Sequence, residues 1–307
     1  MLQFVWTQFG LNLPLIRPTI AEQSAQQIEN IISHLKNALN KETKVAIMDL
    51  CSGSGGGPCV AIQDRLNTGE HAKENISIYL SDLYPSVDTW KLLSSKHKNL
   101  KFVDKSVNAM NIPKDWDPLF FFFEKVLKEF ESTGVNNSGD EDSDEDEQVC
   151  VIRTMFGCLH HFNSEQLSQI LKDTMIQGHC FMAVDLVRFD EKPDHCLQDL
   201  GGLLFWGVSV LLGSPFIFLL TVFKLRPFRP LWLCFFWLLL WVAYFDSNVS
   251  WARAHPFREV LKLAYQQCGQ QNVLYRWQHT YLQVPFGRRF PAVVCYVGVP
   301  VTFKNLL

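Results

Sequence analysis

The sequence predicts an α/β fold built on a doubly wound, mostly parallel sheet, with a hydrophobic helical hairpin inserted late in the chain. Three observations favour this fold class. Between residues 44 and 187, short apolar runs alternate with stretches of helical periodicity, which is the pattern of βαβ units. A cluster of glycines follows the first apolar run. After residue 199 an almost uncharged segment interrupts the pattern, which resumes near residue 255.

Each expected strand is a short apolar run bounded by turn residues. The expected parallel strands cover 44–50, 76–80, 100–103, 149–156 and 180–187, and an expected antiparallel pair covers 272–284 and 292–300. The expected helices cover 19–39, 58–66, 85–95, 114–131, 163–176 and 255–269. Asn163, with Gln166 three residues later, predicts a capping box at the start of the helix 163–176.

These elements predict one cofactor-binding domain with additions. Residues 1–40 form an N-terminal flap and cap helix. Residues 41–199 form the Rossmann-like core, which contains an acidic, disordered loop at 132–148. Residues 200–246 form the hairpin, and residues 247–307 return as a helix and a strand pair that complete the core.

Composition argues against two classes of function. The net charge is −3, with a local acidic run at 140–147, so no nucleic-acid partner is expected. The nine cysteines are scattered and form no CxxC pair, so we expect neither a zinc ribbon, nor another metal site, nor a thioredoxin-like redox motif. Free thiols within apolar runs are typical of a reducing compartment.

The uncharged segment predicts contact with a lipid membrane. Residues 200–223 carry no charge and are long enough to cross a hydrocarbon core, which takes about 20 residues. A shorter uncharged run covers 230–245, and basic residues lie between the two runs. We therefore expect a membrane location with the α/β domain facing the cytosol. The sequence leaves open whether the hairpin spans the bilayer or re-enters it.

The glycine cluster marks the expected ligand site, because doubly wound sheets bind ligands beyond the carboxyl ends of their strands. A pyrophosphate-binding G-x-G-x-x-G fits poorly, since Pro58 stands at the third glycine position when counted from Gly53. A loop of the form acid-x-Gly-x-Gly-x-Gly fits better. It takes Asp49 as the acid and Cys51, Gly53 and Gly55 at the glycine positions.

This loop resembles the first motif of class I S-adenosylmethionine-dependent methyltransferases. In such enzymes a second acid ends the next strand and accepts hydrogen bonds from both ribose hydroxyls, and Asp82 stands at that place, followed by Leu83. The resemblance also implies that Asp49 balances the cationic amino group of the cofactor, directly or through water. After the third strand the family has an acid before a small residue, where this chain has Asn108 and Ala109.

Four stretches extend the resemblance along the chain. They read DLCSGSGGGP, SDLYPS, IRTMFGCLHHFNSEQLSQILKD and FDSNVSWARAHPFREV. In this order they are similar to a small methyltransferase family that carries a hydrophobic segment late in the domain, and the likeness covers most of residues 44–300. It implies S-adenosylmethionine as the cofactor, and it says little about the methyl acceptor.

Three residues are candidates for catalysis. His160 and His161 follow the fourth strand, where an acceptor would bind, and either could act as a general base or could cap the next helix; His161 is slightly preferred. Asp185, near the end of the fifth strand, orients the substrate or caps the sheet. Methyl transfer is an in-line displacement that alignment alone accelerates, so the sequence leaves open whether a general base is needed.

Other polar residues receive two interpretations. Arg153 lies within a buried strand, and a structural ion pair with a carboxylate is expected. Asp246, Ser250 and Arg253 follow the second apolar run, and they either bind the polar head of an amphiphilic substrate or form a helix terminus with its cap.

The sequence thus predicts a membrane-tethered methyltransferase whose acceptor is an amphiphilic small molecule or a side chain of a membrane protein. Two alternatives remain. One is an inactive membrane scaffold of the same fold, favoured by Cys51 and Asn108 at motif positions. The other is an NAD(P)-dependent oxidoreductase, disfavoured by Pro58. The acceptor, the organelle and the oligomeric state do not follow from the sequence.

Overall fold

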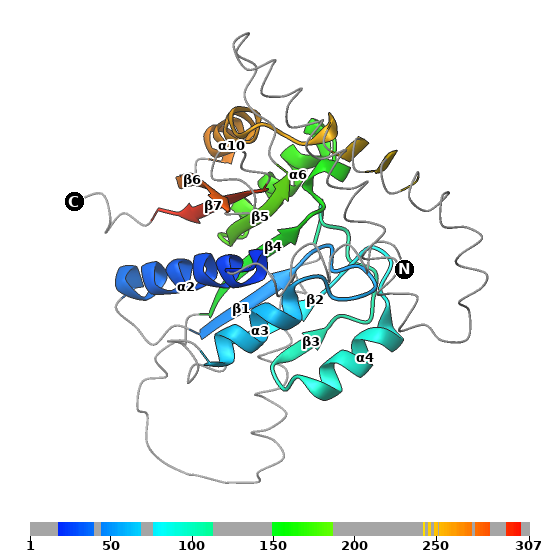
Figure 1. Ribbon diagram of the computed structural model, residues 1–307. Coiled ribbons are helices and arrows are strands. Elements are labelled where there is room, and N and C mark those ends of the chain that lie inside the picture. Colours follow the sequence, from blue (N-terminus) through cyan, green and yellow to red (C-terminus); the bar gives the residue numbers. More distant parts are fainter. Residues whose placement is uncertain are drawn as a thin grey trace, which may run out of the picture.

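The computed structural model describes residues 18–39, 44–68, 76–112, 149–186, 252–271, 274–282 and 293–301, together with residues 242, 245, 246, 249 and 250. In this part the chain forms one seven-stranded sheet flanked by helices, the Rossmann-like α/β fold (Figure 1). The predicted α/β class with a mostly parallel sheet is therefore confirmed.

The strands follow the predicted apolar runs to within three residues at each end. They are β1 (Lys44–Asp49), β2 (Ser77–Leu80), β3 (Leu100–Phe102), β4 (Val149–Phe156), β5 (Cys180–Leu186), β6 (Tyr275–Leu282) and β7 (Val293–Pro300). In space their order is β3-β2-β1-β4-β5-β7-β6. The first five strands pair in parallel, and β7 runs antiparallel to both of its neighbours.

The α-helices of these ranges also lie where helical periodicity predicts them. They are α2 (Ile20–Leu39), α3 (Cys59–Thr68), α4 (Val87–Lys96), α6 (Ser164–Ile176) and α10 (Phe257–Gln271). The short 3₁₀ helix η3 (Leu159–His161), which precedes α6, was not predicted. The capping box is confirmed, because the Asn163 side chain accepts from the Gln166 N–H at 2.9 Å and the Gln166 side chain accepts from the Asn163 N–H at 2.9 Å. Thr19 and Glu22 cap α2 in the same reciprocal way.

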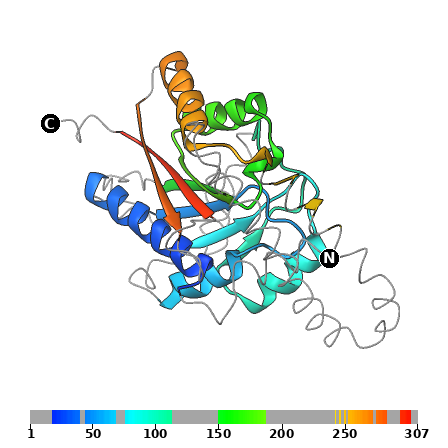
Figure 2. The same ribbon diagram turned by 45° about the horizontal axis from the view of Figure 1, so that its top comes forward.

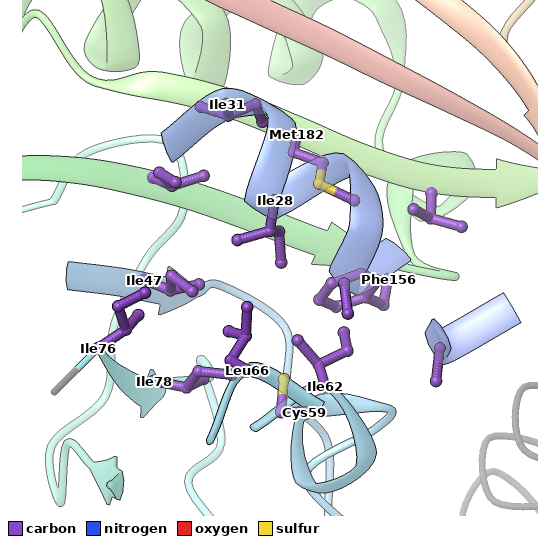
Figure 3. Close-up of a cluster of buried hydrophobic side chains, with 14 of the residues drawn as sticks. Ile28, Ile31, Ile47, Cys59, Ile62, Leu66, Ile76, Ile78, Phe156 and Met182 are labelled. Atoms are coloured by element: carbon purple, nitrogen blue, oxygen red, sulfur yellow. The ribbon is translucent and has the colours of Figure 1, made fainter. Parts of the chain in front are cut away.

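The sheet lies between two layers of helices, with α2, α3 and α4 on one side and α6 and α10 on the other (Figure 2). Because successive side chains of a strand point to opposite faces, Ile47 packs in the first layer and Met48 in the second. Figure 3 shows the first layer, whose labelled side chains include Ile28 and Ile31 of α2, Ile62 and Leu66 of α3, and Ile78, Phe156 and Met182 of the sheet.

The predicted membrane location and transmembrane segments are contradicted. In the described parts of the chain, no helix is both long enough and apolar enough to cross a membrane. α2 has 20 residues, but it is amphipathic and carries Glu22, Glu29 and Lys36. The prediction rested on the composition of residues 200–246, and nearly all of these lie outside the described residues, as do the expected helix 114–131 and the acidic loop 132–148.

Candidate functional site

The candidate site lies at the carboxyl edge of the sheet, beside the neighbouring strands β1 and β4. From β1 the chain proceeds outward through β2 to β3 and then crosses to β4, so the strand order reverses between β1 and β4. Ligands of doubly wound sheets bind at this kind of position. The loop after β1, the end of β2, the turn after β4 and the end of β5 all meet at this edge.

Asp49 ends β1 and is almost completely buried, with 1% of its surface exposed. One carboxylate oxygen accepts from the Ser52 hydroxyl at 2.7 Å and the other from the Thr154 hydroxyl at 3.1 Å. Burial raises the pKa of Asp49 to about 6, and the bonds from Ser52, Cys59 and Thr154 oppose that rise. Both oxygens are therefore bonded to groups of the protein, and Asp49 holds the loop that follows β1.

The glycine loop is bonded to the acid that ends β2. The N–H of Gly53 donates to Asp82 Oδ2 at 3.0 Å, and the N–H of Tyr84 donates to Asp82 Oδ1 at 2.9 Å. Gly53 has φ +58°, in the left-handed region that favours glycine. The structure thus brings together Gly53 and Asp82, which are 29 residues apart in the sequence.

Further turning of the loop occurs at Gly56 and Gly57, which the motif spacing does not single out and whose φ angles are +68° and +51°. A Cβ atom on Gly56 would lie 3.2 Å from Leu80 and 3.3 Å from Leu93. The loop therefore packs closely against β2 and α4, and Gly55 of the predicted motif lies between the turning residues.

The segments that follow β2 and β3 form another part of the candidate site. Leu83 is 46% exposed, the Ser106 hydroxyl donates to its carbonyl at 2.7 Å, and the Val107 N–H donates to the Asp82 carbonyl at 2.9 Å. Asn108 is exposed, and its side-chain oxygen already accepts from the Met110 N–H at 3.0 Å. Ala109, beside it, is buried. The predicted adenine-binding residues therefore lie next to the Asp82 segment.

Cys51, at a predicted glycine position, lies beside Cys158, which follows β4. The Cys158 thiol is buried, and its pKa is raised by the hydrogen bond with Cys51 and then by desolvation. Cys51 is only partly buried and packs against the apolar cluster that contains Cys158. A small side chain at residue 51 therefore fills the space between the β1 loop and the β4 turn.

His160 and Asp185 form a buried pair. Asp185 accepts from the His160 backbone N–H at 2.7 Å, and its other oxygen lies 2.7 Å from His160 Nδ1. The His161 ring is more exposed and lies 4.3 Å, centroid to centroid, from the His160 ring. Desolvation lowers the pKa of His161, followed by the charge of His160, while Asp185 acts in the opposite direction. The three predicted catalytic residues therefore lie together.

The segment before α10 returns to this edge. The charge of Asp246 raises the pKa of His161 and the charge of Arg253 lowers it. His255 anchors the segment to the turn after β4, because its Nε2 lies 2.8 Å from the Phe162 carbonyl and its Nδ1 lies 3.1 Å from Glu259. Ser250 is buried.

Arg153 lies on the other side of the sheet from the glycine loop, toward α6. Its guanidinium donates to Asp173 at 2.6 Å and to His179 Nδ1 at 3.0 Å. The expected structural ion pair is therefore confirmed, with Asp173 as the carboxylate.

Sequence reasoning missed Thr154 and Trp90. Thr154 is a polar residue within the apolar run of a central strand, and a polar residue at such a place indicates a buried hydrogen bond. The indole N–H of Trp90, on α4, donates to the Gly53 carbonyl at 2.9 Å. No local pattern indicates that contact.

No protein-family model and no curated protein matches the chain. Solved structures resemble it only distantly. The methyltransferase domain of a bacterial Hen1 protein is 10% identical with a TM-score of 0.41, covering 90% of this chain and 98% of that one. Human N-acetylserotonin methyltransferase, solved with SAM, is 9% identical with a TM-score of 0.41, covering 92% and 54%. A protein described as a zinc-dependent alcohol dehydrogenase from Rhodobacter sphaeroides is 10% identical with a TM-score of 0.41, covering 97% of both chains. Likeness at this level does not decide between functions.

Proposed function

We propose that this chain is an S-adenosylmethionine-dependent methyltransferase. The observation that carries the proposal is the hydrogen bond from the Gly53 N–H to Asp82 Oδ2. It joins, at the point where strand order reverses, the two parts that the sequence motifs assign to the cofactor: the glycine loop after β1 and the acid after β2.

The residues at this edge fit such a cofactor. An ionised carboxylate offers about four acceptor positions, and the Gly53 and Tyr84 N–H groups occupy two of those on Asp82. The remaining positions suit two ribose hydroxyls. Leu83 offers an exposed apolar surface beside them, and the buried Ala109 is the small residue that the cofactor motif has at this place. When bound, the cofactor supplies a methyl group on a sulfonium.

The same residues fit a dinucleotide less well. In the dinucleotide-binding sheet the strands lie in the order 3-2-1-4-5-6, whereas here the antiparallel β7 separates β5 from β6. The third glycine of the pyrophosphate loop, which packs helix against strand, is Pro58. These differences favour a methyltransferase over the oxidoreductase.

His161 is the proposed general base. A base must be unprotonated to act, and the lowered pKa of His161 favours the neutral imidazole near pH 7. The buried His160–Asp185 pair fixes the turn that carries it. This arrangement suits an acceptor with an O–H or N–H group, from which His161 takes the proton during transfer. An amphiphilic acceptor stays a prediction.

Calorimetry with S-adenosylhomocysteine tests the proposal. We expect the purified chain to bind it, and Asp82→Ala to weaken binding about 10- to 150-fold through the loss of charge-assisted hydrogen bonds. Asp88→Ala, an exposed acid on α4, is the matched control and should bind like the unmodified chain. Absence of binding by the unmodified chain would contradict the proposal. Binding without methyl transfer to any cell-extract fraction would favour the inactive scaffold.

A further inference from the structure

Trp90 has an environment that its position on a surface helix does not explain. It is the one buried residue of α4, with 0% of its surface exposed. Its ring packs in the first core layer, 6.4 Å from the ring of Phe102. Its indole N–H points toward the site and donates to the Gly53 carbonyl at 2.9 Å. The packing accounts for a large apolar ring, and the hydrogen bond accounts for an indole.

The peptide groups of Gly53 are held from two directions. The carbonyl accepts from Trp90 of α4, while the N–H donates to Asp82 at the end of β2. Glycine with a positive φ has no Cβ to restrict it, so the peptide groups on either side rotate easily unless they are bonded. Loss of either hydrogen bond therefore lets Gly53 rotate, and this rotation destabilises the other hydrogen bond.

α4 also supports the rest of the loop. The Leu93 side chain, one turn after Trp90, approaches the position that a Cβ of Gly56 would occupy. Ser52 donates its N–H to the Ser81 carbonyl at 3.0 Å, which attaches the start of the loop to β2. The loop thus lies on a surface made by β2 and α4, and Trp90 supplies the hydrogen bond from the helix.

We propose that Trp90 is a positioning residue for the cofactor: its indole N–H fixes the orientation of Gly53 and thereby keeps Asp82 aimed at the bound ligand. This inference rests on the proposed function. A loop that is already ordered before binding loses less freedom when the ligand arrives, and affinity rises accordingly. Without the indole donor, the ligand must order the loop when it binds, and this cost lowers the affinity.

Trp90→Phe tests this role, since it keeps a large ring in the core and removes the N–H. We expect affinity for S-adenosylhomocysteine, measured by calorimetry, to fall about 2- to 12-fold, the usual effect of one hydrogen bond. Trp277→Phe is the matched control, because Trp277 lies on β6 at the far end of the sheet. It should change the melting temperature without changing the affinity.

A double-mutant cycle separates positioning from a general loss of stability. Trp90→Phe and Asp82→Asn act on the two sides of Gly53, so their effects on affinity should be non-additive. Trp277→Phe combined with Asp82→Asn should be additive. Additive effects in both cycles, or unchanged affinity in Trp90→Phe, overturn the inference while leaving the proposed function in place. If the unmodified chain does not bind, both fail.

Hydrogen exchange gives a readout that does not depend on ligand affinity. In Trp90→Phe, amides of residues 50–57 should exchange faster than in Trp277→Phe. The amides of β4 and β5 in Trp90→Phe should exchange as they do in the unmodified chain. Should Trp90→Phe fail to fold, the indole N–H signal of Trp90 in the unmodified chain takes its place. It should exchange slowly and shift on addition of S-adenosylhomocysteine; an unaffected signal contradicts the proposal.

Discussion

The burial of Asp49 makes the stability of the folded chain depend on pH. Its pKa is raised from 3.8 to about 6 in the folded chain, chiefly by burial, so the folded state holds this proton more tightly than the unfolded state does. Stability therefore falls as pH rises from about 4 to about 6 and stays lowered above that range. At 1.36 kcal/mol per pKa unit the loss is at most about 3 kcal/mol.

Asp49→Asn removes this dependence, because the amide stays neutral at every pH. We expect the free energy of unfolding of the variant, relative to the unmodified chain, to increase from pH 4 to pH 6.5. Urea unfolding at several pH values measures it. Asp88→Asn, at an exposed residue, is the matched control. A constant difference for Asp49→Asn would show that its pKa is close to 3.8 when folded.

The pKa of His161 should respond in opposite directions to two nearby charges. Arg253 lowers that pKa and Asp246 raises it. We therefore expect Arg253→Gln to raise the pKa and Asp246→Asn to lower it, as followed by NMR titration of the imidazole ring. Equal titration of His161 in both variants would place these residues away from it.

Some residues of the site are predictable and others are not. Asp49, Gly53 and Asp82 follow from short motifs at the ends of apolar runs, because their spacing is local. Thr154 bonds Asp49 across 105 residues of sequence, and Trp90 bonds Gly53 across 37. Such bonds depend on which elements become neighbours, so no sequence window contains them.

At the scale of elements, two glycines outside the site should respond oppositely to alanine. A Cβ on Gly298 of β7 would lie 2.6 Å from the ring of Trp277, its pairing partner on β6, so Gly298→Ala should destabilise by about 1–3 kcal/mol. Gly269 in α10 has open space around its Cβ position, so Gly269→Ala should stabilise by about 0.5–1 kcal/mol. Urea unfolding of both variants measures the contrast. Equal effects would contradict the β6–β7 register.

The bounds of the elements are well predicted because they depend on local signals. The apolar run 149–156 coincides with β4 from Val149 to Phe156, and Asn163 marks the start of α6. The place of β7 between β5 and β6 has no local signal. It results from pairing between residues such as Val184 and Cys295, which only the folded sheet brings together.

At the scale of the whole molecule, uncharged composition was a poor guide. It predicted a membrane location from residues 200–246, whereas the helices in the described ranges are amphipathic or short. Within those ranges, apolar side chains are buried against the two faces of the sheet.

The place of β7 in the sheet also determines when the sheet can be completed during synthesis of the chain. β1 to β5 can pair as soon as Leu186 has been made, but the outer edge of β5 stays open until Val293–Pro300 follows. At about 5–20 residues per second, the ribosome leaves that edge exposed for on the order of ten seconds. During this time a half-finished sheet presents unpaired backbone groups flanked by apolar side chains, which is the kind of surface that chaperones bind and that neighbouring nascent chains can join.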